Sequence, residues 1–308
     1  MTRISRFATA ISCLALLALA VPAAAQVNPQ QAAKIRAAAP RQAQVAPKKA
    51  RTVLIWNTPP ALMEKDPHRG YCIPFGECAM KVLGEKTGAF KAVASDDLAM
   101  YLPEKIKQFD AIVMNNSSGA WIRPADAELE KFRAVGGDKD AVEQALRRSL
   151  LDFVSRGGGI VAVHFAIGAN PQWPEFRQLV GARFTGHPWN EEVGVKVEEP
   201  GSPLLAAFGG KDFRLADEIY EFGDPYSRQS LRVLLSLDTK ATNMKVKWIN
   251  RKDGDFAQAW VKRHGQGRVL CCGFGHRTEI WWNPAILRFY LDAVQFACGD
   301  LEAPTAPR

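Results

Sequence analysis

The 308-residue chain carries 40 Lys and Arg against 32 Asp and Glu, which gives a formal net charge of +8. The whole surplus lies in residues 1–51, which hold eight basic residues and no acidic residue. The rest of the chain is therefore electrically neutral, and no basic stripe or base-stacking motif accompanies it, which argues against a nucleic-acid-binding protein.

The first 25 residues have the pattern of a signal peptide. Arg3 and Arg6 form a basic head, residues 11–21 are almost entirely apolar, and Ala23-Ala24-Ala25 supplies a small-residue cleavage site before Gln26. The apolar run is too short to span about 30 Å of hydrocarbon as a helix. We expect a periplasmic or secreted protein with no membrane association after signal removal; a retained membrane anchor is the alternative.

Residues 26–51 are rich in Ala, Gln, Pro and basic side chains, without an aromatic residue or a hydrophobic period. Such a segment offers little apolar surface to offset the entropy lost on ordering. The sequence therefore predicts a disordered basic tether over residues 26–51.

Residues 52–302 show no internal linker or repeat and are expected to form one domain. Apolar strand-like runs alternate with helix-period segments in its first half, and four more strand-like runs precede a closing helix. The predicted strands are 52–57, 109–115, 159–165, 193–198, 232–237, 256–263 and 268–274, and the predicted helices are 77–85, 97–108, 140–155 and 283–297. This alternation predicts an α/β fold with a mostly parallel sheet and helices on both faces, whose ligands gather at the carboxyl ends of the strands.

Five cysteines remain after signal removal. Cys72 and Cys78 could pair in an oxidising compartment, whereas Cys271, Cys272 and Cys298 are expected to be buried free thiols. The odd number and the missing CxxC spacing argue against a disulfide framework or a zinc-binding motif.

The segment around His164 predicts a sharp strand-to-helix elbow. Three glycines, Gly157 to Gly159, precede an apolar strand that ends at His164, and Ala162 and Ala166 lie two positions to either side. Small residues at those offsets allow the close backbone approach that an elbow requires. The simpler interpretation is a histidine that is hydrogen-bonded at a strand end.

Four ordered segments resemble the ThuA-like (trehalose utilisation) family over residues 52–299. They are residues 153–164, 179–188, 217–222 and 265–269, the last followed by Gly275-His276. The resemblance implies a flavodoxin-like, class I glutamine amidotransferase-like fold and a role in sugar metabolism, with trehalose-related disaccharides as substrates, as their oxidised 3-keto forms. The chain departs from the family pattern at residues 256–259, which lack a proline-containing step, and at residues 133–143, which resemble an insertion.

In the related amidotransferases the elbow residue is a cysteine nucleophile, whereas this chain has His164. Because an imidazole cannot readily replace a thiolate in glutamine hydrolysis, we do not expect a functional glutamine amidotransferase.

Four of the five histidines fall at predicted strand ends or in adjoining loops. We assign His164 and His187 as metal ligands, with a carboxylate from Asp217-Glu218, for a divalent ion such as Zn or Mn. Glu218, His276 and His68 are the predicted catalytic residues, with His68 at the rim. Without a metal, a Glu218 whose pKa is raised by burial could itself shuttle protons. His264 is expected to be exposed and is left out, and no nucleotide cofactor is expected.

Other polar and aromatic residues have two interpretations each. Trp281 and Trp282 could form a sugar-stacking platform or belong to the core. Asn115, Asn116 and Ser117 could bind a ligand or cap the next element.

The sequence thus indicates a carbohydrate-processing enzyme that acts on a keto-disaccharide or glycoside by general acid/base chemistry, as an isomerase, lyase or hydrolase. The alternatives are a non-catalytic periplasmic sugar-binding or sensing protein, and an interaction protein that uses the basic segment. The expected partner is a small-molecule carbohydrate, and self-association into a homo-oligomer is compatible with the sequence.

Overall fold

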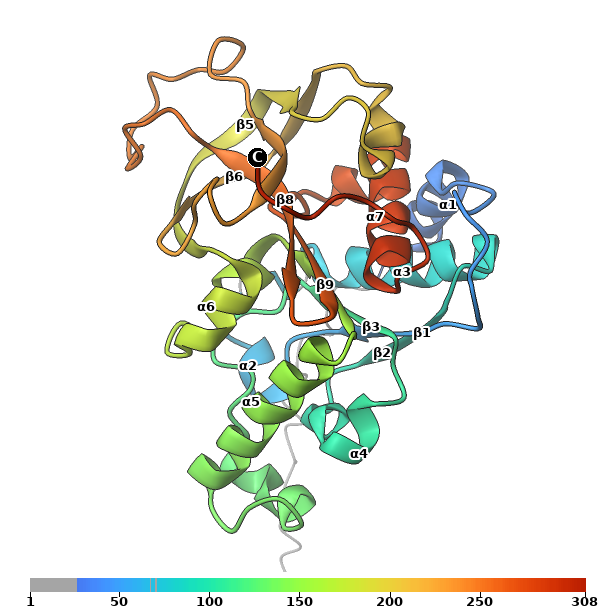
Figure 1. Ribbon diagram of the computed structural model, residues 1–308, viewed down its shortest axis with the longest axis vertical. Coiled ribbons are helices and arrows are strands. Elements are labelled where there is room, and N and C mark those ends of the chain that lie inside the picture. The colour runs from blue at the N-terminus through green and yellow to red at the C-terminus, as the bar shows by residue number, and fades with distance from the viewer. Residues whose placement is uncertain (1–26, 67, 70) are drawn as a thin grey trace, which may run out of the picture.

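The structure is a computed structural model that describes residues 27–66, 68–69 and 71–308. The predicted signal peptide, residues 1–25, lies outside the described residues. The described residues form one nine-stranded sheet in the order β2-β1-β3-β4-β9-β8-β7-β5-β6, with helices on both of its faces (Figure 1).

One half of the sheet is parallel. It contains β2 (Lys91–Ser95), β1 (Thr52–Trp56), β3 (Ala111–Asn115), β4 (Gly159–Val163) and β9 (Gly267–Cys272). The register sets Asn115 beside Val163 and Val163 beside Cys272. The loops that leave β3, β4 and β9 therefore start from the same edge of the sheet, as expected for parallel neighbours.

The other half is antiparallel, so the expectation of a mostly parallel sheet is wrong for this part. It contains β8 (Ala257–His264), β7 (Arg232–Leu237), β5 (Arg183–Val197) and β6 (Phe213–Gly223). The reversal starts at the tight hairpin between His264 and Gly267, where Gly265 adopts a positive φ of 57°. A two-residue connection can join only antiparallel strands.

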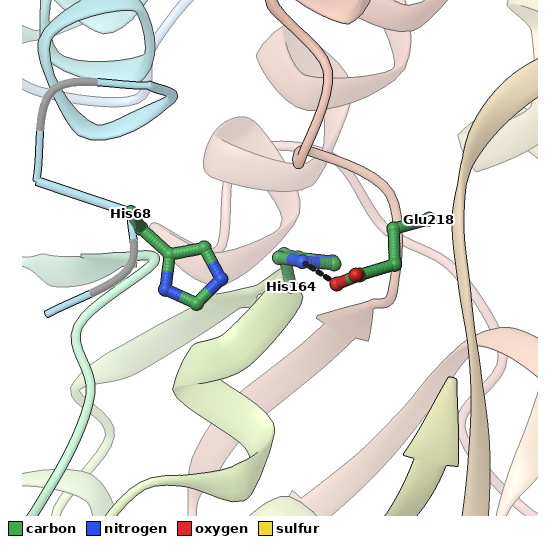
Figure 2. Close-up of side chains that lie close together, drawn as sticks. All are labelled: His68, His164 and Glu218. Atoms are coloured by element: carbon green, nitrogen blue, oxygen red, sulfur yellow. Dashed lines mark ion pairs between the residues drawn. The ribbon is translucent and has the colours of Figure 1, made fainter. Parts of the chain in front are cut away.

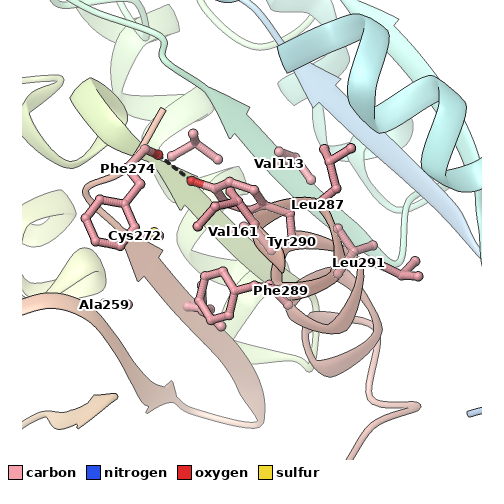
Figure 3. Packing of buried hydrophobic residues seen from close by; sticks show 14 of the residues in the cluster. Val113, Val161, Ala259, Cys272, Phe274, Leu287, Phe289, Tyr290 and Leu291 are labelled. Carbon is pink, nitrogen blue, oxygen red and sulfur yellow. Dashed lines mark hydrogen bonds between the residues drawn. The ribbon is translucent and has the colours of Figure 1, made fainter. Parts of the chain in front are cut away.

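Side chains from alternate positions of the strands build two cores, one on each face. Val53 and Ile55 of β1 point into one core, and Leu54 and Trp56 into the other. The first core is covered by α3 (Ile73–Thr87) and α7 (Pro284–Ala297), and the second by α5 (Lys139–Ser155) and α6 (Pro174–Val180). Figure 3 shows α7 lying against β4 and β9 through Phe289, Tyr290 and Leu291.

Local sequence signals explain the helix boundaries. Asn283 caps α7 by accepting hydrogen bonds from the backbone of Ala285 and Ile286, with Pro284 in the first turn. The helix predicted over residues 97–108 is instead split, because the residue before Pro103 is forced into an extended conformation. The remaining short helices are α2 (Pro60–Met63), α4 (Pro103–Ile106), η1 (Leu98–Tyr101), η2 (Asp126–Phe132), η3 (His164–Gly168), η4 (Pro203–Phe208) and η5 (Thr278–Trp282).

Residues 27–51 pack on the domain, which contradicts the predicted disordered tether. Helix α1 (Pro29–Ala38) begins with a capping box formed by Asn28 and Gln31, and it places Ile35 in the core beside α3. Beyond the helix, the side chain of Gln295 accepts a hydrogen bond from the backbone of Gln44 and donates one to Val45. The backbone N–H of Gln44 and the carbonyl of Val45 therefore form hydrogen bonds with the domain in place of water.

Arg51 closes this segment with two ion pairs. Its guanidinium lies 2.6 Å from the buried carboxylate of Asp300 and 3.0 Å from Asp110. Asp110 precedes β3, and Asp300 follows α7. Arg51, which the sequence assigned to the tether, therefore belongs to the folded part.

The five cysteines in the described part of the chain are free, and Cys72 and Cys78 are not paired. Among the described residues, no helix combines the length and apolarity that crossing a membrane would require.

We predict that Ile35→Ala lowers the free energy of unfolding by about 2 to 5 kcal/mol, since it empties part of a fully buried site. Thermal or denaturant unfolding of the chain from Gln26 onward would measure this, with the exposed residue Gln30 of the same helix changed to Ala as the control. Equal stability of the two variants would show that the segment does not pack on the core.

Candidate functional site

The predicted histidines and Glu218 meet at the carboxyl edge of the parallel strands. His68 lies in the loop before α3, His164 follows β4 directly, and Glu218 lies in β6 (Figure 2). His276 comes from the loop after β9, and His187 from β5. The structure therefore brings all five residues together, as the sequence predicted. By contrast, His264 is at the β8–β9 hairpin, at the opposite edge of the sheet.

His164 occupies the predicted elbow. Its φ is 51°, in the left-handed region, and η3 starts at the same residue. The flanking Ala162 and Ala166 are fully buried, as a close backbone approach requires. The elbow turns the imidazole of a buried strand end toward the neighbouring loops.

Two hydrogen bonds fix the tautomer of His164. Its Nδ1 lies 2.6 Å from the carbonyl oxygen of Gly273, and because a carbonyl only accepts, Nδ1 carries the proton. Its Nε2 is then the acceptor, and it receives a hydrogen bond of 2.6 Å from the Tyr220 hydroxyl. The Tyr220 ring stacks on the imidazole with centroids 4.1 Å apart.

His68 is oriented by a buried carboxylate. Its Nδ1 lies 3.0 Å from Oδ1 of Asp66, which also accepts a hydrogen bond from the His68 backbone. The other Asp66 oxygen accepts the Thr58 hydroxyl at 2.6 Å. Burial raises the pKa of Asp66, but the hydrogen bonds from His68 and Thr58 outweigh it and lower the pKa. Asp66 is therefore ionised and holds the His68 proton on Nδ1, so that Nε2 presents its lone pair.

The Glu218 carboxylate lies between three histidines. Oε2 is 3.4 Å from Nε2 of His164 and 3.9 Å from Nε2 of His276, whereas Oε1 is 3.3 Å from Nδ1 of His187. Burial raises the pKa of Glu218, but the interactions with His164, His276 and His187 outweigh burial and lower it to about 2. The expectation of a raised Glu218 pKa is therefore wrong, and this carboxylate is ionised near neutral pH.

His164 and His276 are neutral under the same conditions. Burial lowers the pKa of His164, against the opposing effect of Glu218. It also lowers the pKa of His276, to about 4. An ionised carboxylate among neutral imidazoles is the protonation state that metal ligands require.

The residues present fit a divalent metal ion. One ligand atom each from His68, His164 and Glu218 lie within 4.8 Å of one another. Both histidines donate their Nδ1 proton to an oxygen acceptor, which is the usual outer-shell arrangement around histidine ligands. Two imidazoles and a carboxylate form a ligand set found at catalytic zinc sites.

This ligand set differs from the one that the sequence suggested. His187, expected as a ligand, has a side chain that is 54% exposed and contacts the other oxygen of Glu218. His68, expected at the rim, is 3% exposed and lies beside His164, with ring centroids 5.4 Å apart. The difference arises because the long β5 carries His187 outward, whereas Asp66 holds His68 inward.

The two adjacent acidic residues of β6 have separate tasks, because successive residues of a strand point to opposite faces. Asp217 is fully buried and accepts hydrogen bonds from the backbone of Gly275 and Arg277, at 2.7 and 2.8 Å. It thereby fixes the loop that carries His276.

Glu221 is the third acidic residue of β6, and its carboxylate accepts a hydrogen bond from the backbone of Asn250. Of the three carboxylates, that of Glu218 is therefore the one that faces the histidines.

Three contributing residues were missed at the sequence level: Asp66, Asp217 as a loop anchor, and Tyr220. Tyr220 could have been found, since it lies two residues after Glu218 and a strand places both on one face. The role of Asp66 had no comparable signal, because it depends on how the loop before α3 folds.

Of the two interpretations of Trp281 and Trp282, the structure supports the core. Trp281 is fully buried, stacks on Tyr290 and donates its indole proton to Gly275. Trp282 packs against Phe75. Tyr71, which is 42% exposed, lies near the site, with its ring centroid 4.7 Å from that of His276.

The polar residues after β3 are buried. Asn115 donates hydrogen bonds to Asn57 and Ile73, which is a structural role. Asn116 and Ser117 are fully buried, and their side chains have no hydrogen-bond partner within the described part of the chain.

A concave space lies away from the histidines and Glu218. It has a volume of about 830 Å³ and is lined by residues that precede the strands, including Arg51, Asp110 and Gly158. It is therefore at the amino edge of the parallel strands, opposite the histidines.

The fold is shared with known proteins. The ThuA family model, described as trehalose utilisation, matches residues 53–297. The chain is similar to a ThuA-like protein from Bacteroides uniformis, at 25% identity and a TM-score of 0.61, over 82% of this chain and 92% of that one. It has the same fold as a ThuA-like protein from Parabacteroides merdae, at 14% identity and a TM-score of 0.53, over 84% of this chain and 98% of that one.

None of the curated proteins matches the sequence. The family match covers most of the chain and includes every residue of the site described above. The chain therefore belongs to the ThuA family, whose description as trehalose utilisation indicates a carbohydrate-related role.

Proposed function

We propose that this protein is a carbohydrate-processing enzyme that acts on a keto-disaccharide or glycoside by metal-assisted general acid/base chemistry. The observation that carries the proposal is the joint arrangement of His68, His164 and Glu218, with both Nδ1 atoms tied to oxygen acceptors. The family's association with a disaccharide supports a sugar as the substrate.

His68, His164 and Glu218 would hold a divalent ion such as Zn or Mn. Such an ion, when bound, supplies Lewis-acid polarisation of a substrate carbonyl or glycosidic oxygen. Asp66 and the Gly273 carbonyl keep the two imidazoles in the required tautomer. The ionised Glu218 would offset part of the positive charge of the ion.

His276 is the proposed proton acceptor. It is neutral, and its side chain is 18% exposed, more than those of His68 and His164. Its Nδ1 is buried without a hydrogen-bond partner among the described residues. A neutral imidazole beside a polarised carbonyl can remove a proton from the adjacent carbon, as enolisation or elimination requires. His187, on the exposed side of Glu218, is placed to hydrogen-bond a substrate hydroxyl.

Metal binding is the first test. We predict that the purified protein binds Zn²⁺ or Mn²⁺, and that His164→Ala abolishes binding. Asp66→Asn should weaken it by about 10- to 100-fold, since it removes only the group that orients His68. Calorimetric titration measures both effects. Wild-type affinity in the His164 variant would place the ion elsewhere.

Turnover is the second test. We predict that the metal-loaded protein converts at least one member of a panel of 3-keto-glycosides. His276→Gln should lower the rate by about 10²- to 10⁴-fold with the metal content unchanged. His264→Ala, at the opposite edge of the sheet, serves as the control. Product analysis by mass spectrometry reports the outcome. Sugar binding without product in the wild-type protein would instead favour the sugar-binding alternative.

Export is the third test, and we propose a periplasmic or secreted mature protein that starts at or near Gln26. Cleavage there would leave the Asn28 capping box and helix α1 intact. N-terminal sequencing of material from the periplasm should give Gln26. A chain that retains Met1 in the membrane fraction would contradict the proposal.

A further inference from the structure

Nε2 of His164 is engaged within the protein itself. It accepts a hydrogen bond of 2.6 Å from the Tyr220 hydroxyl, while Nδ1 donates to Gly273. A neutral imidazole has one ring lone pair available for either a hydrogen bond or a metal. A ligand bond to a cation and the Tyr220 hydrogen bond therefore use the same pair of electrons.

We propose that Tyr220 is a latch on the metal site: its hydroxyl competes with the divalent cation for Nε2 of His164 and must turn away when the cation binds. This inference rests on the metal centre of the proposed function. It adds a residue that sets the affinity of that centre.

The ring of Tyr220 has little freedom to leave the site. It is 1% exposed, it stacks on His164, and it contacts Phe184 edge-on with centroids 4.6 Å apart. Its backbone carbonyl accepts a hydrogen bond from the buried side chain of Gln258. The ring therefore stays close to His164, and the hydroxyl can leave the direction of the Nε2 lone pair only by a small displacement.

The Glu218 carboxylate offers the hydroxyl a second acceptor. Oε2 of Glu218 lies 3.4 Å from Nε2 of His164, so the two candidate acceptors are adjacent, and the hydroxyl also interacts with Glu218. Redirecting the hydroxyl proton from His164 to Glu218 would free the lone pair without leaving a buried hydroxyl unsatisfied. The latch would then hold His164 in its ligating orientation before the cation arrives.

The test compares cation affinity in wild type and Tyr220→Phe. Removing the competing hydrogen bond should tighten Zn²⁺ and Mn²⁺ binding by about two- to tenfold, the effect of one net hydrogen bond. Chelator competition at one pH measures both constants. Tyr101→Phe is the matched control, because this buried tyrosine packs on Trp56 and Trp121 and should leave the affinity unchanged.

The outcomes separate the latch from the metal centre. Binding by the wild type with equal or weaker affinity in Tyr220→Phe overturns the latch and leaves the centre standing. No binding by either protein overturns the centre, and the latch with it. Detectable binding only in Tyr220→Phe supports both.

A measurement on the wild-type protein covers the case in which Tyr220→Phe does not fold. The hydrogen-bonded hydroxyl proton of Tyr220 should give an NMR signal that shifts or disappears when Zn²⁺ is added. A signal that is unchanged at saturating Zn²⁺ would overturn the latch.

Discussion

The placement of one ionised carboxylate, that of Glu218, organises the site. Its two oxygens face histidines from β5, from the end of β4 and from the loop after β9. Glu218 itself comes from β6, the outermost strand of the antiparallel half of the sheet. A purely parallel sheet would supply the elbow histidine without its carboxylate partner. The antiparallel half therefore supplies the carboxylate of the candidate site.

The sequence predicted most strands of the sheet, and it predicted which residues meet at its edge. Apolar runs are sufficient to predict β3, β4 and β7, because these strands are largely buried. The pattern missed β2 and β6. In β6 the alternation is broken by the buried polar residues Asp217 and Glu221. Those residues bind the backbone of distant loops, and contacts of that kind leave no periodicity in the sequence.

The direction of the Glu218 pKa shift was predicted wrongly for a related reason. Burial alone raises a carboxyl pKa, and the position of Glu218 in a predicted interior suggested that outcome. The three histidines reverse it, and they come from parts of the chain far from Glu218 in sequence. The packing of residues 27–51 on the domain was not predicted for the same reason. It depends on hydrogen bonds with Gln295 and Asp300, which lie far away in the sequence.

His164 shows how a sharp strand-to-helix elbow can position an imidazole. A left-handed conformation strains most residues, although histidine tolerates it better than a β-branched side chain. Here the strain is offset by the Gly273 hydrogen bond, the Tyr220 stack and complete burial. In a nucleophile elbow the same geometry exposes a reactive atom to substrate. In this chain the buried imidazole instead presents a nitrogen to Glu218 and His68. Under the proposed function the elbow would position a metal ligand and leave His187 and His276 to contact the substrate.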